Sequence, residues 1–532
     1  MAIAIDFGTS NTVISRWNAA TQQAETVNLP GLAQLVGDSP PLVPSLLYLE
    51  DAQAGRVLVG QAVRDRGLDL ANDRRCFRGF KRGIGAAVQG FLPTLDGQTL
   101  SFEQLGSWFL QTLLAAIAPT ATEDSLILTV PVDSFEAYRL WLSQACQAFP
   151  ADTVRLLDEP TAAALGYGTA DRDLLLVVDF GGGTVDLSLV QLNASTQAMK
   201  TKPLGFILKW GANNLGDSPA QKIQTARVLA KAGQNLGGND IDNWLVDYFA
   251  REQGLPKTSL LTRLAERLKL KLSVQPTATE VYFNDETLES YELALTRDRF
   301  QQLLTEQRFF DQLDDLMTAV LQRSRLQGIA VQDIDAVLLV GGTTQIPAVQ
   351  DWVRRYFPAE KVRAEQPFTA IATGALQLAQ GFEVKDFLYH SYGVRYWNRR
   401  EQCHSWQPLV KAGQPYPMPE PVELVLGASV DNQPQIELII GELGAETGAT
   451  EVFFDGDRLV TRAVGSGQTA VQPLNDREGA RALAELSPPG SPGRDRLKLQ
   501  FWVDPERYLR VNVEDLLTQR ALLEAAKVVQ LS

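Results

Sequence analysis

Two short segments carry the same set of residue types that can bind an anion. They are DFGTSN, from Asp6 to Asn11, and DFGGGT, from Asp179 to Thr184. Glycine allows positive φ and lets backbone N–H groups approach an anion, and hydroxyl side chains add further donors. The residues concerned are Gly8, Thr9, Ser10, Gly181, Gly182, Gly183 and Thr184. One such turn is equally an ordinary Gly-rich β-turn, but two equivalent copies predict facing hairpins that clamp a polyphosphate.

The aspartates that open these segments predict where a counter-charge would sit. Asp6 and Asp179 stand at equivalent strand ends. A carboxylate can hold a magnesium ion through the water molecules of the ion without touching the phosphate directly. We therefore expect Mg²⁺ between the two turns.

A third segment, AVLLVGGTTQIPAVQDWV, consists of an apolar strand, then Gly341, Gly342 and Thr343, then an amphipathic helix. Free N–H groups at a helix N-terminus can bind a ligand, and the glycines leave room for a flat one. A strand-Gly-Gly-helix joint also arises from packing alone. Its position after the two hairpins makes it a candidate ligand site.

The elements that must position these residues alternate between strands and helices. From Met1 to about Gly381, apolar runs such as LILTVPV and LLLVVDF are set between amphipathic stretches, which predicts an α/β fold. MAIAIDFGTSNTVISRW and DLLLVVDFGGGTVDLSLVQL share one pattern of apolar strand, turn and alternating strand. This internal likeness predicts a duplicated domain with two facing halves.

Beyond GFEVKDFLYHSYG the pattern changes to short alternating runs such as PVELVLGASV, QIELIIGEL and RLKLQFWV, broken by turn residues. Runs of this kind predict an antiparallel, all-β sandwich. The Pro- and Gly-rich stretch ELSPPGSPGRDR is expected to be a loop between two strands.

Composition excludes several classes of protein. A chain of 532 residues forms more than one compact unit, and a net charge of -14 argues against nucleic acid as a partner. Cys76, Cys146 and Cys403 are scattered and only two histidines are present, so a zinc site is not supported. Reduced thiols and the lack of a signal-like N-terminus or an 18-residue apolar run predict a cytoplasmic protein without a membrane span.

The order of two phosphate turns and a later Gly-Gly turn resembles the superfamily of actin, sugar kinases and heat-shock ATPases. Further segments resemble DnaK-type seventy-kilodalton heat-shock chaperones over nearly all of residues 1–381, namely TVPVDSFEAYR, LLDEPTAAALGYG, LGGNDIDNWLVDYF, AERLKLKLS and LTRDRFQQLL. The resemblance implies a duplicated, two-lobed actin-like ATPase domain (ribonuclease-H-like) at 1–383. A linker at 384–391 and a substrate-binding β-sandwich at 392–532 would follow.

The resemblance also implies roles for individual residues. Asp6, Asp179 and Glu159 would organise Mg²⁺ and the attacking water, with the two aspartates acting on the metal through waters. Lys81, in GFKRGIG, would orient the nucleophile and stabilise charge on the γ-phosphate, although a surface lysine is the alternative. Asp186 would help to order the water. The residues implied to bind ATP or ADP are Asp6, Gly8, Thr9, Ser10, Asn11, Gly181, Gly182, Gly183, Thr184, Gly237, Gly238, Glu266, Lys269, Ser273, Gly341, Gly342, Thr343, Gln345 and Ile346.

The adenosine pocket departs from the family pattern. Glu266, Lys269 and Ser273 fall on one face of a predicted helix, as ribose and adenine contacts require. Gln345, however, replaces the arginine that normally stacks on the base, and Phe368 replaces an acidic residue. We therefore expect the protein to bind phosphate groups but to discriminate only weakly between ATP and GTP.

Communication between domains is implied by a second group of residues. Pro131 and Arg139 match a pair that couples nucleotide state to domain rotation, although a proline that merely ends a strand is the alternative for Pro131. Arg155 matches a contact of J-domain cochaperones, or is a solvated arginine. The linker keeps an apolar core, with Asp386, Phe387 and Leu388 as coupling residues, and has Ser391 where the family is acidic.

Two regions look unlike the family. The segment at about 199–226 looks inserted, as a hairpin or helical tip that either contacts a partner through GFILKW or packs on its own lobe. The chain stops near the expected end of the sandwich, which predicts that the helical lid is missing.

The leading hypothesis is an ATP-hydrolysing, chaperone-like protein that binds extended polypeptide, with a J-domain cochaperone and an exchange factor as candidate partners. The alternatives are a small-molecule kinase, an actin-like scaffold and a nucleotide-binding regulator without peptide binding.

Overall fold

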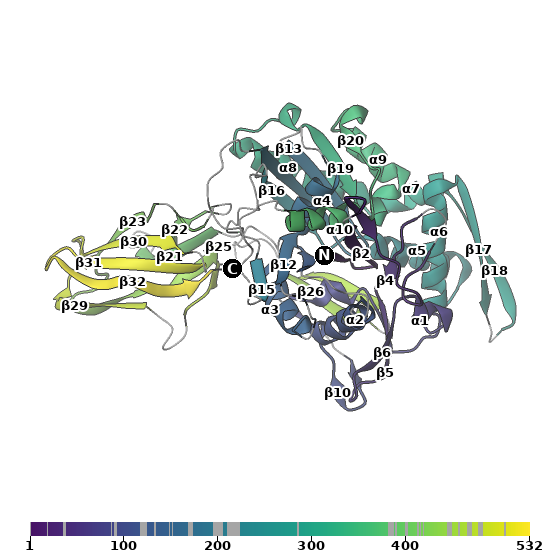
Figure 1. Ribbon diagram of the computed structural model, residues 1–532, viewed down its shortest axis with the longest axis horizontal. Coiled ribbons are helices and arrows are strands. Elements are labelled where there is room, and N and C mark those ends of the chain that lie inside the picture. Colours follow the sequence, from purple (N-terminus) through teal and green to yellow (C-terminus); the bar gives the residue numbers. More distant parts are fainter. Residues whose placement is uncertain are drawn as a thin grey trace. The chain divides into compact units, whose positions relative to one another are not determined.

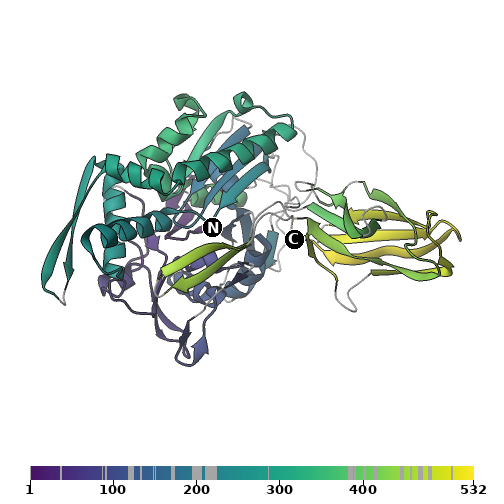
Figure 2. The same cartoon turned by 180° about the vertical axis from the view of Figure 1, so that it is seen from behind.

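The computed structural model describes residues 2–531 except 19, 36–38, 87, 90–92, 118–124, 132–134, 148, 150, 152, 169–173, 195–205, 210–223, 285–286, 381–387, 389–390, 399–402, 412–413, 415, 419, 444–448, 456–457, 465–470, 477–481 and 505–506. The chain forms two compact units. Unit 1 comprises residues 1–384 and 450–463, and unit 2 comprises 385–449 and 464–532. Figures 1 and 2 show the chain from opposite sides.

Unit 1 is built on two larger sheets, and the first defines lobe I. Its strand order is β15-β12-β11-β1-β2-β3, with β4 paired to β2. The strands are β1 (Ala2–Phe7), β2 (Asn11–Asn18), β3 (Gln23–Thr26), β4 (Val43–Pro44), β11 (Ser125–Val130), β12 (Thr153–Asp158) and β15 (Phe206–Lys209). β1 pairs with β2 antiparallel and with β11 parallel, and β11 pairs with β12 parallel.

The second sheet defines lobe II and repeats this topology, in the order β16-β14-β13-β19-β20. The strands are β13 (Leu174–Phe180), β14 (Val185–Ala194), β16 (Gln224–Gln234), β19 (Ala336–Val340) and β20 (Val362–Arg363). β13 pairs with β14 antiparallel and with β19 parallel, as β1 does with β2 and β11. β13 is an almost continuous buried run, as expected of a strand covered on both faces. The predicted duplication is confirmed.

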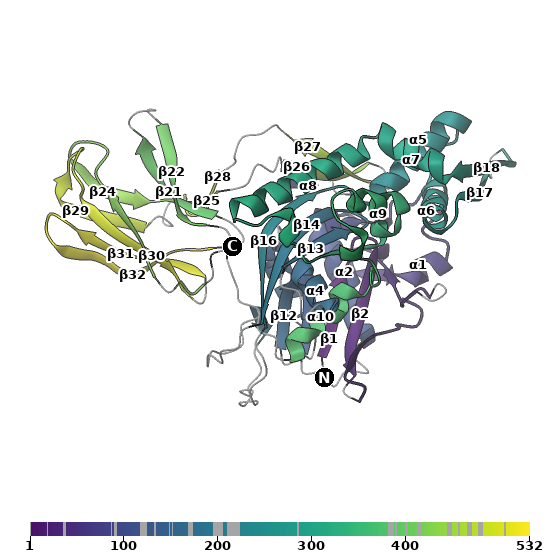
Figure 3. The same cartoon turned by 90° about the horizontal axis from the view of Figure 1, so that it is seen from above.

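Helices cover both sheets and cross between them (Figure 3). The helices are α1 (Gln61–Asp65), α2 (Phe102–Ile117), α3 (Phe135–Ala145), α4 (Glu159–Gly166), α5 (Gly238–Gln253), α6 (Ser259–Val274), α7 (Arg297–Glu306), α8 (Phe309–Leu326), α9 (Pro347–Arg354) and α10 (Ala370–Ala375). α4 and α10 cross at glycines. A Cβ on Gly166 would lie 1.9 Å from the Ala370 oxygen, and one on Gly374 would lie 1.9 Å from the Ala162 oxygen.

Shorter elements complete unit 1. They are β5 (Leu46–Asp51), β6 (Arg56–Val59), β7 (Cys76–Arg78), β8 (Val88–Gln89), β9 (Thr94–Leu95), β10 (Gln98–Thr99), β17 (Thr277–Asn284), β18 (Glu289–Thr296), β26 (Ala449–Asp455) and β27 (Arg458–Val464). Among the helices that the structure describes, none is long and apolar enough to cross a membrane.

Unit 2 is the predicted β-sandwich, with sheets in the orders β22-β21-β25-β28, β23-β30-β31-β32 and β24-β29. The strands are β21 (Ser391–Asn398), β22 (Cys403–Val410), β23 (Val422–Leu426), β24 (Gln433–Leu438), β25 (Ile440–Leu443), β28 (Val471–Pro473), β29 (Ala482–Gly490), β30 (Leu497–Val503), β31 (Tyr508–Asp515) and β32 (Arg520–Gln530). Alternate residues of β30 are buried, as a sandwich strand requires.

One local prediction about unit 2 is wrong. The stretch that begins ELSPPG was expected to be a loop, but β29 continues through both prolines to Gly490, which pairs with Gln433. β29 belongs to a two-stranded sheet, so one of its edges has no neighbouring strand. Proline, which has no backbone N–H, can be accommodated on such an edge without loss of a hydrogen bond to another strand.

Candidate functional site

The two Asp-Phe-Gly turns lie against each other. Each joins the first two strands of its lobe, so the repeated topology places them equivalently. A Cβ on Gly182 would lie 1.8 Å from Ser10 Oγ, and one on Gly183 would lie 2.7 Å from Thr9 Cγ2. Only glycine permits this approach. The structure thus brings together the two turns that the sequence singled out.

The glycines before α5 join this cluster. Gly238 N donates to the Gly181 oxygen at 3.1 Å, and Asn239 N donates to the Gly182 oxygen at 2.8 Å. Ser10 Oγ donates to Asn239 Oδ1 at 3.1 Å, which links lobe I to the start of α5. A Cβ on Gly237 would lie 2.4 Å from the Gly182 oxygen.

The Gly-Gly turn after β19 lies against the second Asp-Phe-Gly turn. Gly341 has φ of 84°, which favours glycine, and Thr343 Oγ1 donates to the Gly181 oxygen at 2.8 Å. Ile346 is buried and precedes α9, which starts with Pro347. All three predicted turns therefore converge on one place.

A buried ion pair lies beneath the turns. Lys81 Nζ donates to Glu159 Oε1 at 2.8 Å, and both residues are only 9% exposed. Glu159 is fixed because Asp158 caps α4, accepting from Thr161 N at 2.8 Å, with Pro160 in the first turn. The alternative that Lys81 is a surface lysine is wrong.

Carboxylates crowd around this pair, and their pKa values are raised. Burial, then the charge of Glu159, raises the pKa of Asp6 to about 6 and that of Asp186 to about 7. The pKa of Asp179 is raised well above its ordinary value by burial and by Glu159, Asp186 and Asp6. Burial lowers the pKa of Lys81, but the neighbouring acids more than compensate and raise it.

This surplus of buried acid favours a bound cation. Among the described residues, no three acidic, histidine or cysteine side chains lie close enough to ligate a metal ion directly. A cation held through its waters, as Mg²⁺ often is, fits Asp6 and Asp179 better than a direct cage. Thr129 Oγ1 donates to Asp6 Oδ1 at 3.0 Å and fixes that carboxylate.

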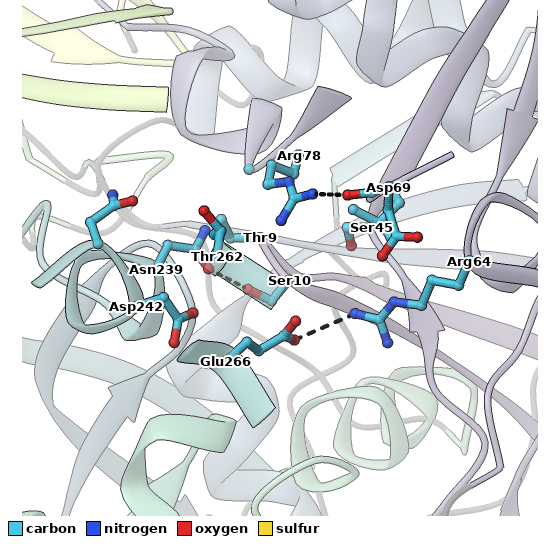
Figure 4. A pocket seen from close by; sticks show the side chains of 13 residues that line it. Thr9, Ser10, Ser45, Arg64, Asp69, Arg78, Asn239, Asp242, Thr262 and Glu266 are labelled. Atoms are coloured by element: carbon cyan, nitrogen blue, oxygen red, sulfur yellow. Dashed lines mark hydrogen bonds and ion pairs between the residues drawn. The ribbon is translucent and has the colours of Figure 1, made fainter. Parts of the chain in front are cut away.

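A pocket opens from the first turn toward α6 (Figure 4). It is lined by Thr9, Ser10, Ser45, Leu46, Arg64, Asp69, Arg78, Gly79, Asn239, Asp242, Asn243, Thr262 and Glu266. Sequence reasoning named only Thr9, Ser10 and Glu266 among these. Asn239, Asp242 and Asn243 lie within LGGNDIDNWLVDYF and Gly79 begins GFKRGIG, but no role was predicted for them. Arg64, Asp69, Arg78 and Thr262 lie in none of the segments quoted above, and only the fold brings them to the pocket.

Charges from both lobes meet in this pocket. Arg64, on α1 of lobe I, lies 3.4 Å from Glu266, on α6 of lobe II, and Arg263 pairs with the same carboxylate at 2.5 Å. Burial opposes ionisation of Glu266, but Arg263 and Arg64 lower its pKa to about 2. The Arg64–Glu266 pair therefore bridges the lobes across the pocket.

The other predicted adenosine contacts have partners within the protein. Lys269 Nζ donates to the Gly238 oxygen at 2.9 Å and pairs with Asp242, and Ser273 Oγ donates to the Lys269 oxygen at 3.1 Å. Gln345 Nε2 is buried without a hydrogen-bond partner among the described residues. A Cβ on Gly342 would lie 3.0 Å from the Phe368 ring, so that ring lies beside the Gly-Gly turn.

The predicted coupling residues are only partly described. Pro131 directly follows β11, and Arg155 Nη1 donates to the Leu378 oxygen at 3.0 Å, so Arg155 is not simply a solvated arginine. Leu388 is 1% exposed. The Arg139 side chain, Asp386 and Phe387 lie outside the described residues. Within the inserted segment, β15 pairs with β12 of lobe I, which is not the lobe from which the segment departs.

Comparison with known proteins agrees with this geometry. A model of the Hsp70 protein family matches residues 86–202 and 225–391. The chain is 26% identical over 448 residues to "Chaperone protein dnaK1" of Synechocystis sp., covering 79% of this chain and 56% of that protein. The chain thus spans about half the length of this curated relative. With more than half of its residues matched by the family model, the chain belongs to the Hsp70 family.

Proposed function

We propose that unit 1 binds ATP with Mg²⁺ and hydrolyses it. The observation that carries this proposal is the buried Lys81–Glu159 pair among carboxylates of raised pKa, directly beneath two converging glycine turns. Backbone N–H groups of the turns would bind the phosphates, together with the hydroxyls of Thr9, Ser10 and Thr184. Mg²⁺, when bound, would neutralise phosphate charge and would be held through waters by Asp6 and Asp179.

Each buried side chain has a task in this reaction. Lys81 Nζ keeps its proton and would stabilise charge that develops on the γ-phosphate. Glu159 holds Lys81 in place and would orient the attacking water. Asp186, with its pKa raised to about 7, suits a group that accepts a proton from that water.

We further propose that the nucleotide state of unit 1 controls binding of extended polypeptide by unit 2, in the cytoplasm. Membership of the Hsp70 family supports this coupling. A J-domain cochaperone near Arg155 and an exchange factor would be the natural partners of such a protein. The boundaries we propose are 1–383 for the ATPase domain, 384–391 for the linker and 392–532 for the sandwich, with residues 450–463 lying in unit 1.

Steady-state hydrolysis of ATP with and without an unfolded polypeptide tests the proposal. Turnover that rises when the polypeptide is added supports a chaperone-like ATPase. Turnover that is unchanged by polypeptide but requires a small phosphate acceptor would instead indicate a kinase. Nucleotide-dependent assembly would indicate a scaffold, and binding without turnover would indicate a regulator.

A further inference from the structure

β15 crosses from one lobe to the other. The chain leaves the lobe II sheet at the end of β14, Ala194, and rejoins it at the start of β16, Gln224. Between these points, β15 pairs with β12, the edge strand of the lobe I sheet. Figure 1 shows β15 beside β12, where the two strands pair.

This strand is a feature of this chain and not of the family pattern. The family model matches residues 86–202 and 225–391, so β15 falls in the gap between the two matches. Its pairing with β12 is antiparallel, whereas β12 and β11 are parallel. β15 therefore adds a strand to a sheet edge that would otherwise offer unpaired N–H and C=O groups.

β12 connects several functional residues. Residues Val154 to Leu156 pair with β15, and the strand runs on to Asp158 and then Glu159, the partner of Lys81. Arg155, in the middle of the paired stretch, donates a hydrogen bond to the backbone oxygen of Leu378, which lies near the C-terminal end of the main segment of unit 1. A strand that docks on β12 thus contacts the element that bears Arg155 and leads directly into Glu159, the first residue of α4.

We propose that β15 is a clamp, tethered to lobe II, whose docking on β12 is coupled to nucleotide binding between the lobes. Roughly a dozen residues join β15 to each of β14 and β16, and each connection can extend to about 40 Å. Because β15 is covalently connected to lobe II, its docking on β12 is an intramolecular event, with an effective concentration set by the distance between its attachment points and β12. That concentration falls when the lobes separate.

Docking of β15 and nucleotide binding are expected to strengthen each other. A nucleotide that contacts both lobes holds them together, which raises the local concentration of β15 at the β12 edge. By thermodynamic reciprocity, docked β15 must then strengthen nucleotide binding by the same factor. This coupling rests on the proposed function, but the docking of β15 does not.

Hydrogen exchange in the full-length protein tests the docking without any nucleotide. In the wild type, we expect the β12 amides that point away from β11 to be protected. Ile207 lies opposite Arg155 in the pairing, so Ile207→Pro should disrupt the strand and speed their exchange about tenfold or more, which corresponds to a cost of roughly 1.4 kcal/mol. Ala212→Pro, three residues beyond β15, is the control and should leave their exchange unchanged.

The β12 amides that point toward β11 provide an internal check, because they should stay protected in every variant that folds. Outward amides that exchange rapidly in the wild type would overturn the proposal. A variant in which residues 203–224 are replaced by a Gly-Ser linker should reproduce the Ile207→Pro result, and retained protection in that variant would also overturn the proposal.

The coupling is tested by repeating the exchange with Mg-ADP and by measuring ADP release with a fluorescent analogue. We expect slower exchange of the outward β12 amides with ADP, and about fivefold faster ADP release from Ile207→Pro than from Ala212→Pro. If ADP binds but changes neither quantity, the clamp is not coupled to nucleotide. If ADP fails to bind the wild type, the proposed function fails, while the docking of β15 is still judged by exchange alone.

Discussion

The buried carboxylates of the candidate site in unit 1 and a buried carboxylate of unit 2 have opposite pKa shifts. In unit 1, burial and the charge of Glu159 raise the pKa of Asp6, Asp179 and Asp186, with Lys81 as the nearby cation. In unit 2, Asp515 receives two hydrogen bonds from Arg496, at 2.7 and 2.8 Å.

The pKa shifts record this difference. Burial opposes ionisation of Asp515, but the bonds from Arg496 and from Leu517 N lower its pKa to about 2. The Arg496–Asp515 pair is complete within the protein, so its role is structural. Asp6, Asp179 and Asp186 are incompletely compensated by Lys81, as expected of a site that takes up an additional cation.

The largest expected effect is on the stability of unit 2. Arg496→Ala leaves Asp515, which is 1% exposed, as an unpaired buried charge, so we expect a loss of about 3–5 kcal/mol in unfolding free energy. Hydrogen exchange of β30 and β31 in the full chain measures this loss. Arg395→Ala removes a half-exposed partner of Asp476 and should cost about 1 kcal/mol or less. Equal losses in the two variants would show that burial of the pair does not matter.

The next effect is on catalysis. Lys81→Ala or Asp179→Asn should reduce single-turnover ATP hydrolysis by about a hundredfold or more, because each removes a group that acts on the transition state. Nucleotide binding should persist. Lys257→Ala breaks an exposed pair with Asp247 and should leave hydrolysis unchanged. Wild-type rates in both site variants would contradict the assignment of this centre.

Acid should weaken unit 2 within a defined pH window. The pKa of Asp515 is depressed in the folded state, so its stabilising effect is complete above its unfolded value of 3.8 and is lost as the pH falls toward about 2. Exchange of β30 and β31 should therefore accelerate over this range. Asp515→Asn has no such carboxylate, and an unchanged pH profile in that variant would remove Asp515 as the cause.

The sequence predicted those parts of the site that are encoded locally. The two turns are short, and each follows an apolar strand of its own, so their residues alone indicate an anion site. Arg64 and Asp69 could not be found this way, because an isolated charge in a short helix or a turn usually lies on the surface. Only the packing of α1 opposite α6 places Arg64 beside Glu266.

Strand pairing at sheet edges was also beyond sequence reasoning. β15 has only four residues, too few for a clear alternation, and its partner β12 is some fifty residues away in the chain. The prolines in β29 indicated a loop, although the edge of a two-stranded sheet accepts them. The duplicated lobes, by contrast, were visible as two similar segments.

The smallest expected effect contrasts the base end of the site with its phosphate end. At the proposed base end, Gln345 stands beside the Gly-Gly turn with a buried Nε2 that has no hydrogen-bond partner among the described residues, and the Phe368 ring lies next to Gly342. Aromatic faces stack on any base, so these residues should bind a purine without choosing adenine strongly. We expect calorimetric affinities for ATP and GTP within about tenfold of each other, or 1.4 kcal/mol.

A gain-of-function variant sharpens this test. Gln345→Arg supplies a planar cation that can stack on the base, and it should tighten ATP binding more than GTP binding if stacking is what the native residue lacks. Gln332→Arg adds the same charge at an exposed position of lobe II and is the matched control. If the wild type already prefers ATP over GTP by several orders of magnitude, the protein recognises adenine through groups other than a stacking cation. The buried amide of Gln345 would then be the first candidate, because its free N–H groups can donate to ring nitrogens that adenine presents as acceptors.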